Sequence, residues 1–228
     1  MKKLFTLIAI LALLVSCTDE PVGIPFLSEE GDTEIVQSKG LRPILERIKD
    51  VEGINGKSKT TLKNKKPLDF SFIYPLTLQF NDESVTQVMD YHDLVNRLKR
   101  ESLGSHVVAI GFPFEIRKVG TIENIPMYDN RDLTGLASSY ELEMVDYNYM
   151  VERGDTCYEI KYPITLIVNN VPATFKVKND ADNYFNGTVL DSGVAIEYPY
   201  EITYLSSKET KVLTSDYEAL QTVKNSCN

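Results

Sequence analysis

The chain has 228 residues, with 24 Lys and Arg against 33 Asp and Glu, and hydrophobic residues make up 43% of it. This composition is that of a globular protein and excludes disorder throughout, and the length is too short for a typical (β/α)₈ barrel. The net charge of −9 argues against nucleic acid as a partner, because phosphate binding needs clustered Lys and Arg.

The first sixteen residues have the layout of a secretory signal peptide. Lys2 and Lys3 precede an apolar run from Leu4 to Val15, in which only Thr6 is polar. The run is too short to span a bilayer comfortably. A buried N-terminal helix is the alternative, but such a helix would be amphipathic and this run is apolar all round. We therefore expect residues 1–16 to be removed.

The end of this run, Leu14-Val15-Ser16-Cys17, resembles the lipobox of bacterial lipoproteins. The resemblance implies that Cys17 receives a diacylglyceryl group and becomes the new N-terminus. Several acyl chains, such as palmitate, would then hold the protein stably on a membrane. The mature chain would carry 22 basic and 33 acidic side chains, a balance of −11.

Residues 17–40 are expected to form an acidic tether. They contain two prolines and six acidic residues but a single lysine, a composition that buries little apolar surface. Thr18-Asp19-Glu20 resembles the export signal of some Bacteroidetes lipoproteins. This implies a location at the outer membrane, on its periplasmic or its surface face.

Residues 41–67 are predicted to form an amphipathic helix and a Lys-rich loop. The helix has Pro43 near its start and Gly53 at its end. Its apolar positions are Leu41, Ile44, Leu45, Ile48 and Val51. The loop could contact an acidic ligand, but a solvated loop is the preferred interpretation. Its lysines are Lys57, Lys59, Lys63, Lys65 and Lys66.

The rest of the chain contains an internal duplication. The nine residues 108–116 match 194–202 at six positions, and 74–78 match 162–166, at offsets of 86 and 88. Two related halves, 68–139 and 156–228, are therefore expected, joined by a connecting strand at 140–155. That strand is predicted from the alternation of Tyr140, Leu142 and Met144, with a turn at Arg153-Gly154-Asp155.

Each half divides again into two copies of one module. An aromatic residue and a proline are expected to pack at the entry of a strand, since proline cannot donate to a ladder. These pairs are Tyr74-Pro75, Phe112-Pro113, Tyr162-Pro163 and Tyr198-Pro199. A turn, a second strand and a short helix follow, and the predicted helix caps are Asp90, Asp129, Asp180 and Asp216. The predicted fold class is α+β: tandem strand-turn-strand-short-helix modules, rich in antiparallel strands, preceded by one amphipathic helix.

The residues Cys157-Tyr158-Glu159-Ile160-Lys161-Tyr162-Pro163-Ile164-Thr165 extend this pattern. They resemble the repeat opening of uncharacterised Bacteroidetes lipoproteins with Tyr-Pro strand repeats. The first half departs from it, because Asp69-Phe70 stands in place of Cys157-Tyr158. The resemblance implies a location and an architecture but no activity.

Two cysteines remain once Cys17 is lipidated. In an oxidising envelope Cys157 and Cys227 would form a disulfide, and two free thiols are the alternative.

No metal site or cofactor is expected. Asp90, His92 and Asp93 are interpreted as a helix cap and a solvated face, because positions 90 and 92 diverge around a helix. The segment Asn179 to Asn183 has the acidic character of a calcium loop, but Gly187 comes too late for its turn.

The preferred functional hypothesis is a non-enzymatic lipoprotein that binds or scaffolds a protein or glycan partner in the cell envelope. The duplication repeats packing residues and not chemistry, and no phosphate loop or nucleophile elbow is present in the sequence. The alternative is an envelope hydrolase that uses Asp and Glu carboxylates on a glycan or peptide polymer. A cleft lined by two or more carboxylates would favour this alternative.

Overall fold

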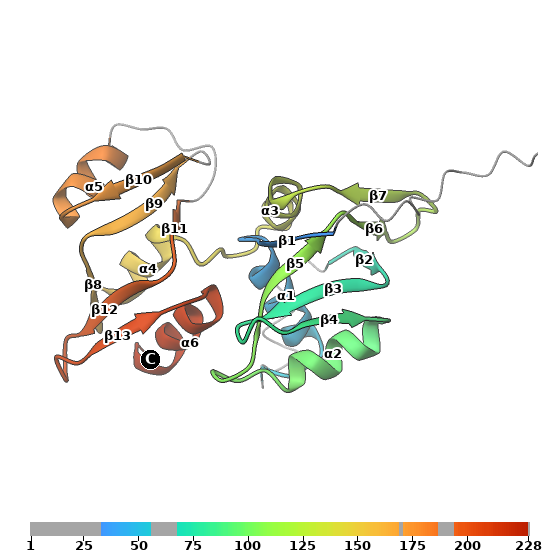
Figure 1. Cartoon of the computed structure of the whole chain (residues 1–228), viewed down its shortest axis with the longest axis horizontal. Helices are drawn as coiled ribbons and strands as arrows, with labels where there is room; N and C mark the ends of the chain where they lie inside the picture. Colours follow the sequence, from blue (N-terminus) through green and yellow to red (C-terminus); the bar gives the residue numbers. More distant parts are fainter. Residues whose placement is uncertain (1–32, 56–67, 169–170, 187–193, 228) are drawn as a thin grey trace, which may run out of the picture. The chain divides into compact units, whose positions relative to one another are not determined.

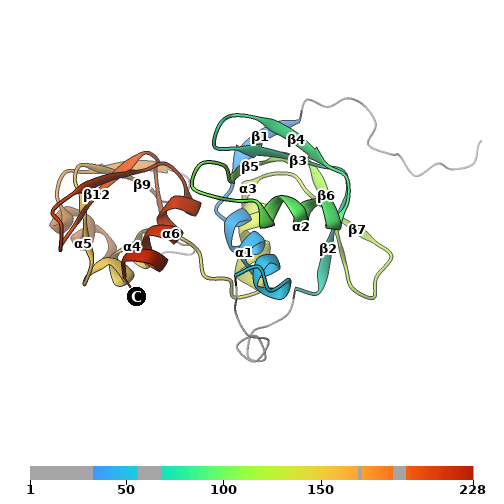
Figure 2. The same ribbon diagram turned by 90° about the horizontal axis from the view of Figure 1, so that it is seen from below.

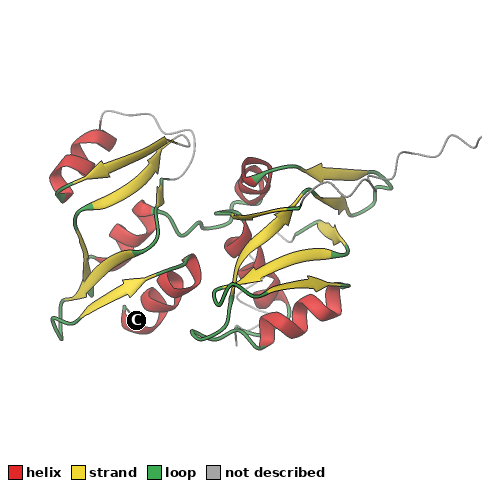
Figure 3. Ribbon diagram, viewed as in Figure 1, coloured by secondary structure: helices red, strands yellow, loops and turns green. Residues whose placement is uncertain are grey.

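The computed structural model describes residues 33–55, 68–168, 171–186 and 194–227 (Figure 1). The predicted signal peptide, Cys17, most of the tether and the lysines of the Lys-rich loop lie outside the described residues. Helices and antiparallel strands alternate along the rest, which makes the fold α+β as predicted (Figure 3).

The two halves have the same order of elements. The first half consists of α1 (Leu41–Val51), β2 (Phe70–Ile73), β3 (Leu76–Phe80), β4 (Val85–Val88), α2 (Tyr91–Lys99), β5 (Val107–Phe112), β6 (Phe114–Lys118), β7 (Asn124–Met127) and α3 (Asn130–Ser139). The second half consists of α4 (Tyr147–Gly154), β8 (Tyr158–Lys161), β9 (Ile164–Val168), β10 (Val171–Phe175), α5 (Lys178–Asn186), β11 (Ala195–Ile196), β12 (Tyr200–Tyr204), β13 (Thr210–Leu213) and α6 (Asp216–Ser226). One further strand, β1 (Glu34–Gln37), precedes the first half.

Strand pairing repeats as well. In the first half the strand orders are β5-β3-β4 and β2-β6-β7, and in the second they are β11-β9-β10 and β8-β12-β13. The registers also correspond, since Leu78 pairs with Ile110 and Leu166 pairs with Ile196. The internal duplication inferred from the sequence is therefore a duplication of topology.

Each module is completed by its neighbour. The hairpin β3–β4 takes its third strand, β5, from the following module, and the hairpin β6–β7 takes β2 from the preceding one. Because two-stranded hairpins are marginally stable alone, a whole half is the smallest unit with complete sheets. Three strands precede each short helix, and not the two that were predicted.

All four aromatic-proline pairs have a cis peptide bond and lie where the chain passes from one sheet to the other. The aromatic rings of Tyr74, Phe112, Tyr162 and Tyr198 are buried or half-buried against the cores. The four prolines, Pro75, Pro113, Pro163 and Pro199, are exposed. Of the two residues predicted to pack at each position, the aromatic ring therefore does so and the proline does not.

Each half has its own hydrophobic core. In the first half, strands curve around α1, which contacts α2, α3 and β5 (Figure 2). Four residues of the predicted apolar stripe of α1 are buried, as expected for an amphipathic helix that faces a core: Leu41, Ile44, Leu45 and Ile48. The fifth, Val51, is the last residue of the helix and is exposed. In the second half α4 occupies the corresponding place in the sequence and contacts α6 and β8.

Two predicted boundaries were wrong. The predicted connecting strand is a bend followed by helix α4, which begins at the N-cap Asp146 and continues through Gly154. The alternating residues Tyr140, Leu142 and Met144 pack on the first core, and the second core begins at Val145. The end of the predicted tether forms β1, which pairs with β5 through Ile35 and Val36, an apolar pair that the acidic composition of the segment obscured.

Candidate functional site

A buried network of charges lies where the two halves meet. Arg42 donates to both carboxylate oxygens of Glu101 at 3.0 Å, and Lys49 lies 3.2 Å from the same group. Glu46 of α1 accepts from Lys224 of α6 at 2.8 Å. Arg42, Glu46 and Lys49 have the spacing that places side chains on adjacent turns of a helix, so one face of α1 supplies most of the network.

The carboxylates of this network are held ionised. Burial opposes ionisation of Glu46, but Lys49, Lys224 and Arg42 outweigh it and lower its pKa to about 2. Burial also opposes the charge of Glu101, yet Arg42 and Lys49 keep the pKa of that carboxyl below its ordinary value. A buried pair of this kind is costly to break, because removal of one partner leaves the other charge uncompensated.

Tyr217 of α6 packs against the network. Its ring lies 4.8 Å from the Arg42 guanidinium carbon and 5.3 Å from the Lys49 nitrogen. The imidazole of His106 stacks on the same ring, with 4.5 Å between centroids. Cations over an aromatic face are attracted to it, so these contacts join the first half to the second.

His106 also bonds to Ser215, the N-cap of α6. Its Nδ1 lies 3.2 Å from the Ser102 carbonyl, which can only accept, and its Nε2 lies 2.7 Å from the Ser215 hydroxyl. Burial lowers the pKa of His106. The neutral ring therefore donates through Nδ1 and accepts the Ser215 proton at Nε2.

The distance between His106 and Ser215 is that of a hydrogen-bonded base and nucleophile. The Ser215 hydroxyl, however, also accepts from the backbone N–H of Glu218 at 3.3 Å, and both side chains are buried. We therefore assign this pair a structural role at the start of α6.

Beside this contact region lies a cleft of about 430 Å³. One wall consists of residues 37–39 and Arg42 of the first half, and the other of residues 195–198 and Ser215 to Tyr217 of the second. Its volume is within the range of about 300–1,000 Å³ that is typical of ligand pockets.

The main polar group of the cleft is Asp216, which accepts from the Tyr198 hydroxyl at 2.7 Å. Burial raises the pKa of Asp216 to about 6, against the lowering effects of that hydrogen bond and of Arg42 and Lys39. The hydroxyl of Ser38 is buried and has no hydrogen-bond partner among the described residues. Glu197, which is exposed, is the second carboxylate of the cleft.

The predicted helix caps divide into two groups. Asp90 and Asp129 cap α2 and α3, and their carboxylates accept from Asp93 N and Asp132 N. Asp216 is the first residue of α6, because Ser215 takes the cap; in the strand register Ser215 corresponds to Asp129. Asp180 lies in the first turn of α5, which begins at Lys178, and is not a cap. The predictions assumed that an aspartate caps every helix. In α6 a serine does so, and α5 begins two residues before its aspartate.

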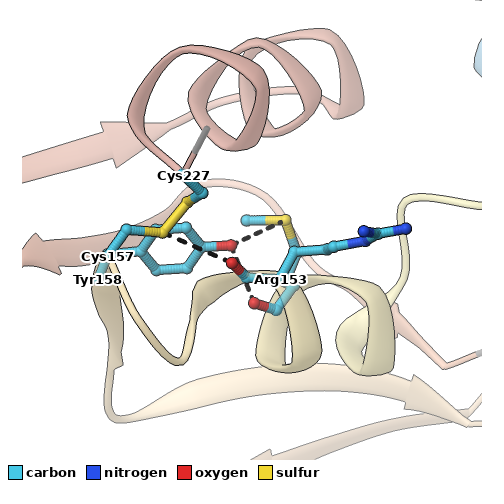
Figure 4. The surroundings of a disulfide bond; sticks show 5 residues. Arg153, Cys157, Tyr158 and Cys227 are labelled. Atoms are coloured by element: carbon cyan, nitrogen blue, oxygen red, sulfur yellow. Dashed lines mark hydrogen bonds between the residues drawn. A yellow bond between two sulfur atoms is a disulfide. The ribbon is translucent and has the colours of Figure 1, made fainter.

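Cys157 and Cys227 form a disulfide, with 5.5 Å between their Cα atoms (Figure 4). It joins the start of β8 to the end of α6, and the hydroxyl of neighbouring Tyr158 donates to the Met150 carbonyl at 2.9 Å. The bond therefore closes the second half upon itself.

The described residues contain no group of three or more His, Cys, Asp or Glu side chains that could hold a metal ion. In the same part of the chain no helix is long and apolar enough to cross a membrane.

Sequence reasoning missed most of the residues at the contact between the halves. Arg42, Glu101, His106 and Tyr217 carry no motif, and they come from segments far apart in the chain. One usable signal was the charge of Arg42 and Lys49 next to the apolar stripe of α1. Comparison of the chain with protein-family models, curated proteins and solved structures gives no match.

Proposed function

We propose that this protein is a bacterial envelope lipoprotein, anchored through lipid on Cys17, whose described body is a non-enzymatic binding module. The proposal places it at the outer membrane, on the periplasmic or the surface face. The cleft beside Asp216 is the observation that carries the binding part of the proposal.

The order of charge, apolar run and lipobox in residues 1–17 supports the anchor. The disulfide between Cys157 and Cys227 supports an oxidising compartment, because such bonds persist outside the cytosol. Neither observation depends on the other.

The use of the chemically capable side chains supports binding over catalysis. Where the halves meet, His106 bonds to Ser215 and Arg42 bonds to Glu101. The cleft is lined by a strand edge, the Tyr198 hydroxyl and the carboxylates of Asp216 and Glu197, and Arg42 and Ser215 in its walls are already bonded to other side chains. Polar groups that converge on a concave site fix the orientation of a bound ligand.

The anchor is tested with Cys17→Ala, expressed in a bacterium that processes lipoproteins and fed an alkyne analogue of palmitate. We expect the wild type to be labelled and to sediment with membranes, and the variant to be unlabelled and soluble. Cys227→Ser is the matched control, since it removes a cysteine but leaves the lipobox. Equal labelling or equal membrane retention of Cys17→Ala and wild type would refute the anchor.

One observation favours the alternative function, a hydrolase that uses carboxylates on a glycan or peptide polymer. The cleft contains both Asp216, with a pKa of about 6, and Glu197, and a carboxyl that is protonated near neutral pH can act as a general acid. Release of reducing ends or amines from labelled cell-wall glycan or casein, abolished by Asp216→Asn, would establish the hydrolase and overturn the binding module.

A further inference from the structure

The duplication shows that one strand position is filled in the first half and open in the second. In the first half β5 lies between β3 and β1. Its counterpart β11 pairs with β9, and no described strand lies on its other side. The segment that corresponds to β1, just before α4, is instead the connection from α3 and forms no strand there. At its end the Tyr147 N–H donates to the Val194 carbonyl at 2.8 Å, so the unpaired part of this edge begins after Val194.

The open edge presents backbone groups to the cleft. Glu197 N–H donates to the Thr165 carbonyl of β9 at 2.9 Å. Because N–H and C=O groups alternate in direction along a strand, those of the preceding residue, Ile196, point away from β9. In the first half the equivalent residue, Ile110, pairs with Val36 of β1. Ile196 thus offers a donor and an acceptor for one more strand.

The residues beside this edge also differ between the halves. Gly111 of β5 has no room for a side chain, because an added Cβ would lie 2.4 Å from the Thr33 methyl group. Its counterpart at the offset of 86 is Glu197, which is exposed at the cleft. In the first half the missing side chain thus leaves room for the segment that contains β1. In the second half a carboxylate stands at the same position.

A second observation points to a ligand in this cleft. Ser38 lines the cleft and is only 5% exposed. Its hydroxyl is buried and has no hydrogen-bond partner among the described residues. Buried hydroxyl groups are normally bonded, so an occupant of the cleft would satisfy it.

We propose that the cleft binds an extended peptide, which adds as a strand to the open edge of β11 and carries a lysine or arginine opposite Glu197. This inference rests on the proposed binding function and names its ligand class.

The register of β1 on β5 predicts the order of side chains in the peptide. Antiparallel partners share a face, and Ile196 is buried in the second core, so the peptide residue opposite it should be apolar, as Val36 is. The residue before it in the peptide stands opposite Glu197, where Ile35 stands opposite Gly111 in the first half. Main-chain bonds would supply affinity and these two side chains specificity.

Charge at the cleft supports a basic residue at that place. Arg42 is compensated by Glu101 and Glu46. Lys39 interacts electrostatically with Asp216 and Asp146. No described residue forms an ion pair with Glu197, so its exposed carboxylate is available to a basic side chain of the peptide.

The probe is the acetylated and amidated peptide Thr-Lys-Val-Gln-Thr, titrated into the full-length Cys17→Ala protein in a calorimeter. Two control peptides differ by one change each: Glu in place of Lys, and an N-methyl group on the Val amide, which blocks its hydrogen bond. We expect saturable binding of the probe and about tenfold weaker binding of each control peptide. Equal affinities, or no binding by any of the three, would overturn the inference.

A matched pair of variants locates the site. Glu197→Lys should bind the Glu-containing peptide better than the Lys-containing one, reversing the wild-type order. Glu209→Lys, an equally exposed charge reversal in the β12–β13 turn, should keep that order. Thermal melts of both variants within the error of the wild type exclude unfolding, and loss of preference in both would place the site elsewhere.

Failure of the peptide and failure of the proposed function are distinguishable. Palmitate labelling at Cys17 without peptide binding contradicts only the ligand class. A dimer that forms with concentration and disappears on deletion of residues 33–37 would show that β1 of a second copy fills the edge, which overturns the peptide assignment.

Discussion

Nε2 of His106 and the hydroxyl of Ser215 lie 2.7 Å apart although 109 residues separate them. The bond joins the end of a loop in the first half to the N-cap of α6 in the second. The Ser215 hydroxyl thus both caps α6 and donates to His106.

Ser215→Ala should lower the free energy of unfolding by about 2 kcal/mol, because it removes a helix cap and leaves a buried imidazole nitrogen without its donor. Asp129→Ala is the matched control, since Asp129 caps α3 at the corresponding position. It should cost about 1 kcal/mol, the cap alone. Urea denaturation of both variants measures the difference, and equal losses would show that the bond to His106 contributes nothing.

Asp216 predicts a pH dependence of stability. Burial raises its pKa to about 6 in the folded protein, from the ordinary value of 3.8. The folded state therefore binds more protons between these values, and the contribution of Asp216 to stability, complete below the lower value, is lost as the pH rises to about 6.

Asp216→Asn resembles the protonated acid and does not titrate. Relative to wild type it should gain stability between pH 4 and pH 7, by about 3 kcal/mol at the upper end. Thermal melts of both proteins across this range test the sign. A difference that is independent of pH would mean that Asp216 titrates normally.

Glu101→Gln should be the most damaging of these substitutions. It leaves Arg42 and Lys49 buried without their shared carboxylate, which should cost about 3–5 kcal/mol. Glu143→Gln breaks an ion pair with Arg153 in which both side chains are more than half exposed, and it should cost less than about 1 kcal/mol. If the two variants unfold at the same urea concentration, the network does not stabilise the contact between the halves.

The disulfide should stabilise the second half by about 4 kcal/mol, since it closes a loop across a sequence separation of 70 residues. The double variant Cys157→Ser/Cys227→Ser should unfold at a lower denaturant concentration than the wild type. In non-reducing mass analysis, the wild type should be two mass units lighter than after reduction. An unchanged mass would show two free thiols.

Repeated local patterns made the fold class predictable. Alternating apolar residues such as Leu76 and Leu78 predicted strands, and the aromatic-proline pairs marked every passage between sheets. The connection at 140–155 was mispredicted because Tyr140, Leu142 and Met144 alternate as in a strand, although all three pack on the first core without forming a strand.

The site was less predictable than the fold. Arg42 and Glu101 are 59 residues apart, and their pairing depends on how α1 packs beside the end of α2. The open edge of β11 has no signal of its own in the sequence. The open edge is found only by comparing the two halves. The first half contains β1 beside Gly111, and the second half has Glu197 at the corresponding position and no described strand beside it.

Amide hydrogen exchange at Ile110 and Ile196 shows directly whether the edge of β11 is open and whether a peptide fills it. We expect the amide of Ile110, which faces β1, to be strongly protected in the free protein, and that of Ile196 to exchange faster and to become protected when the Lys-containing peptide is added. Equal protection of the two amides without peptide would contradict this expectation, because the edge of β11 would then already be filled.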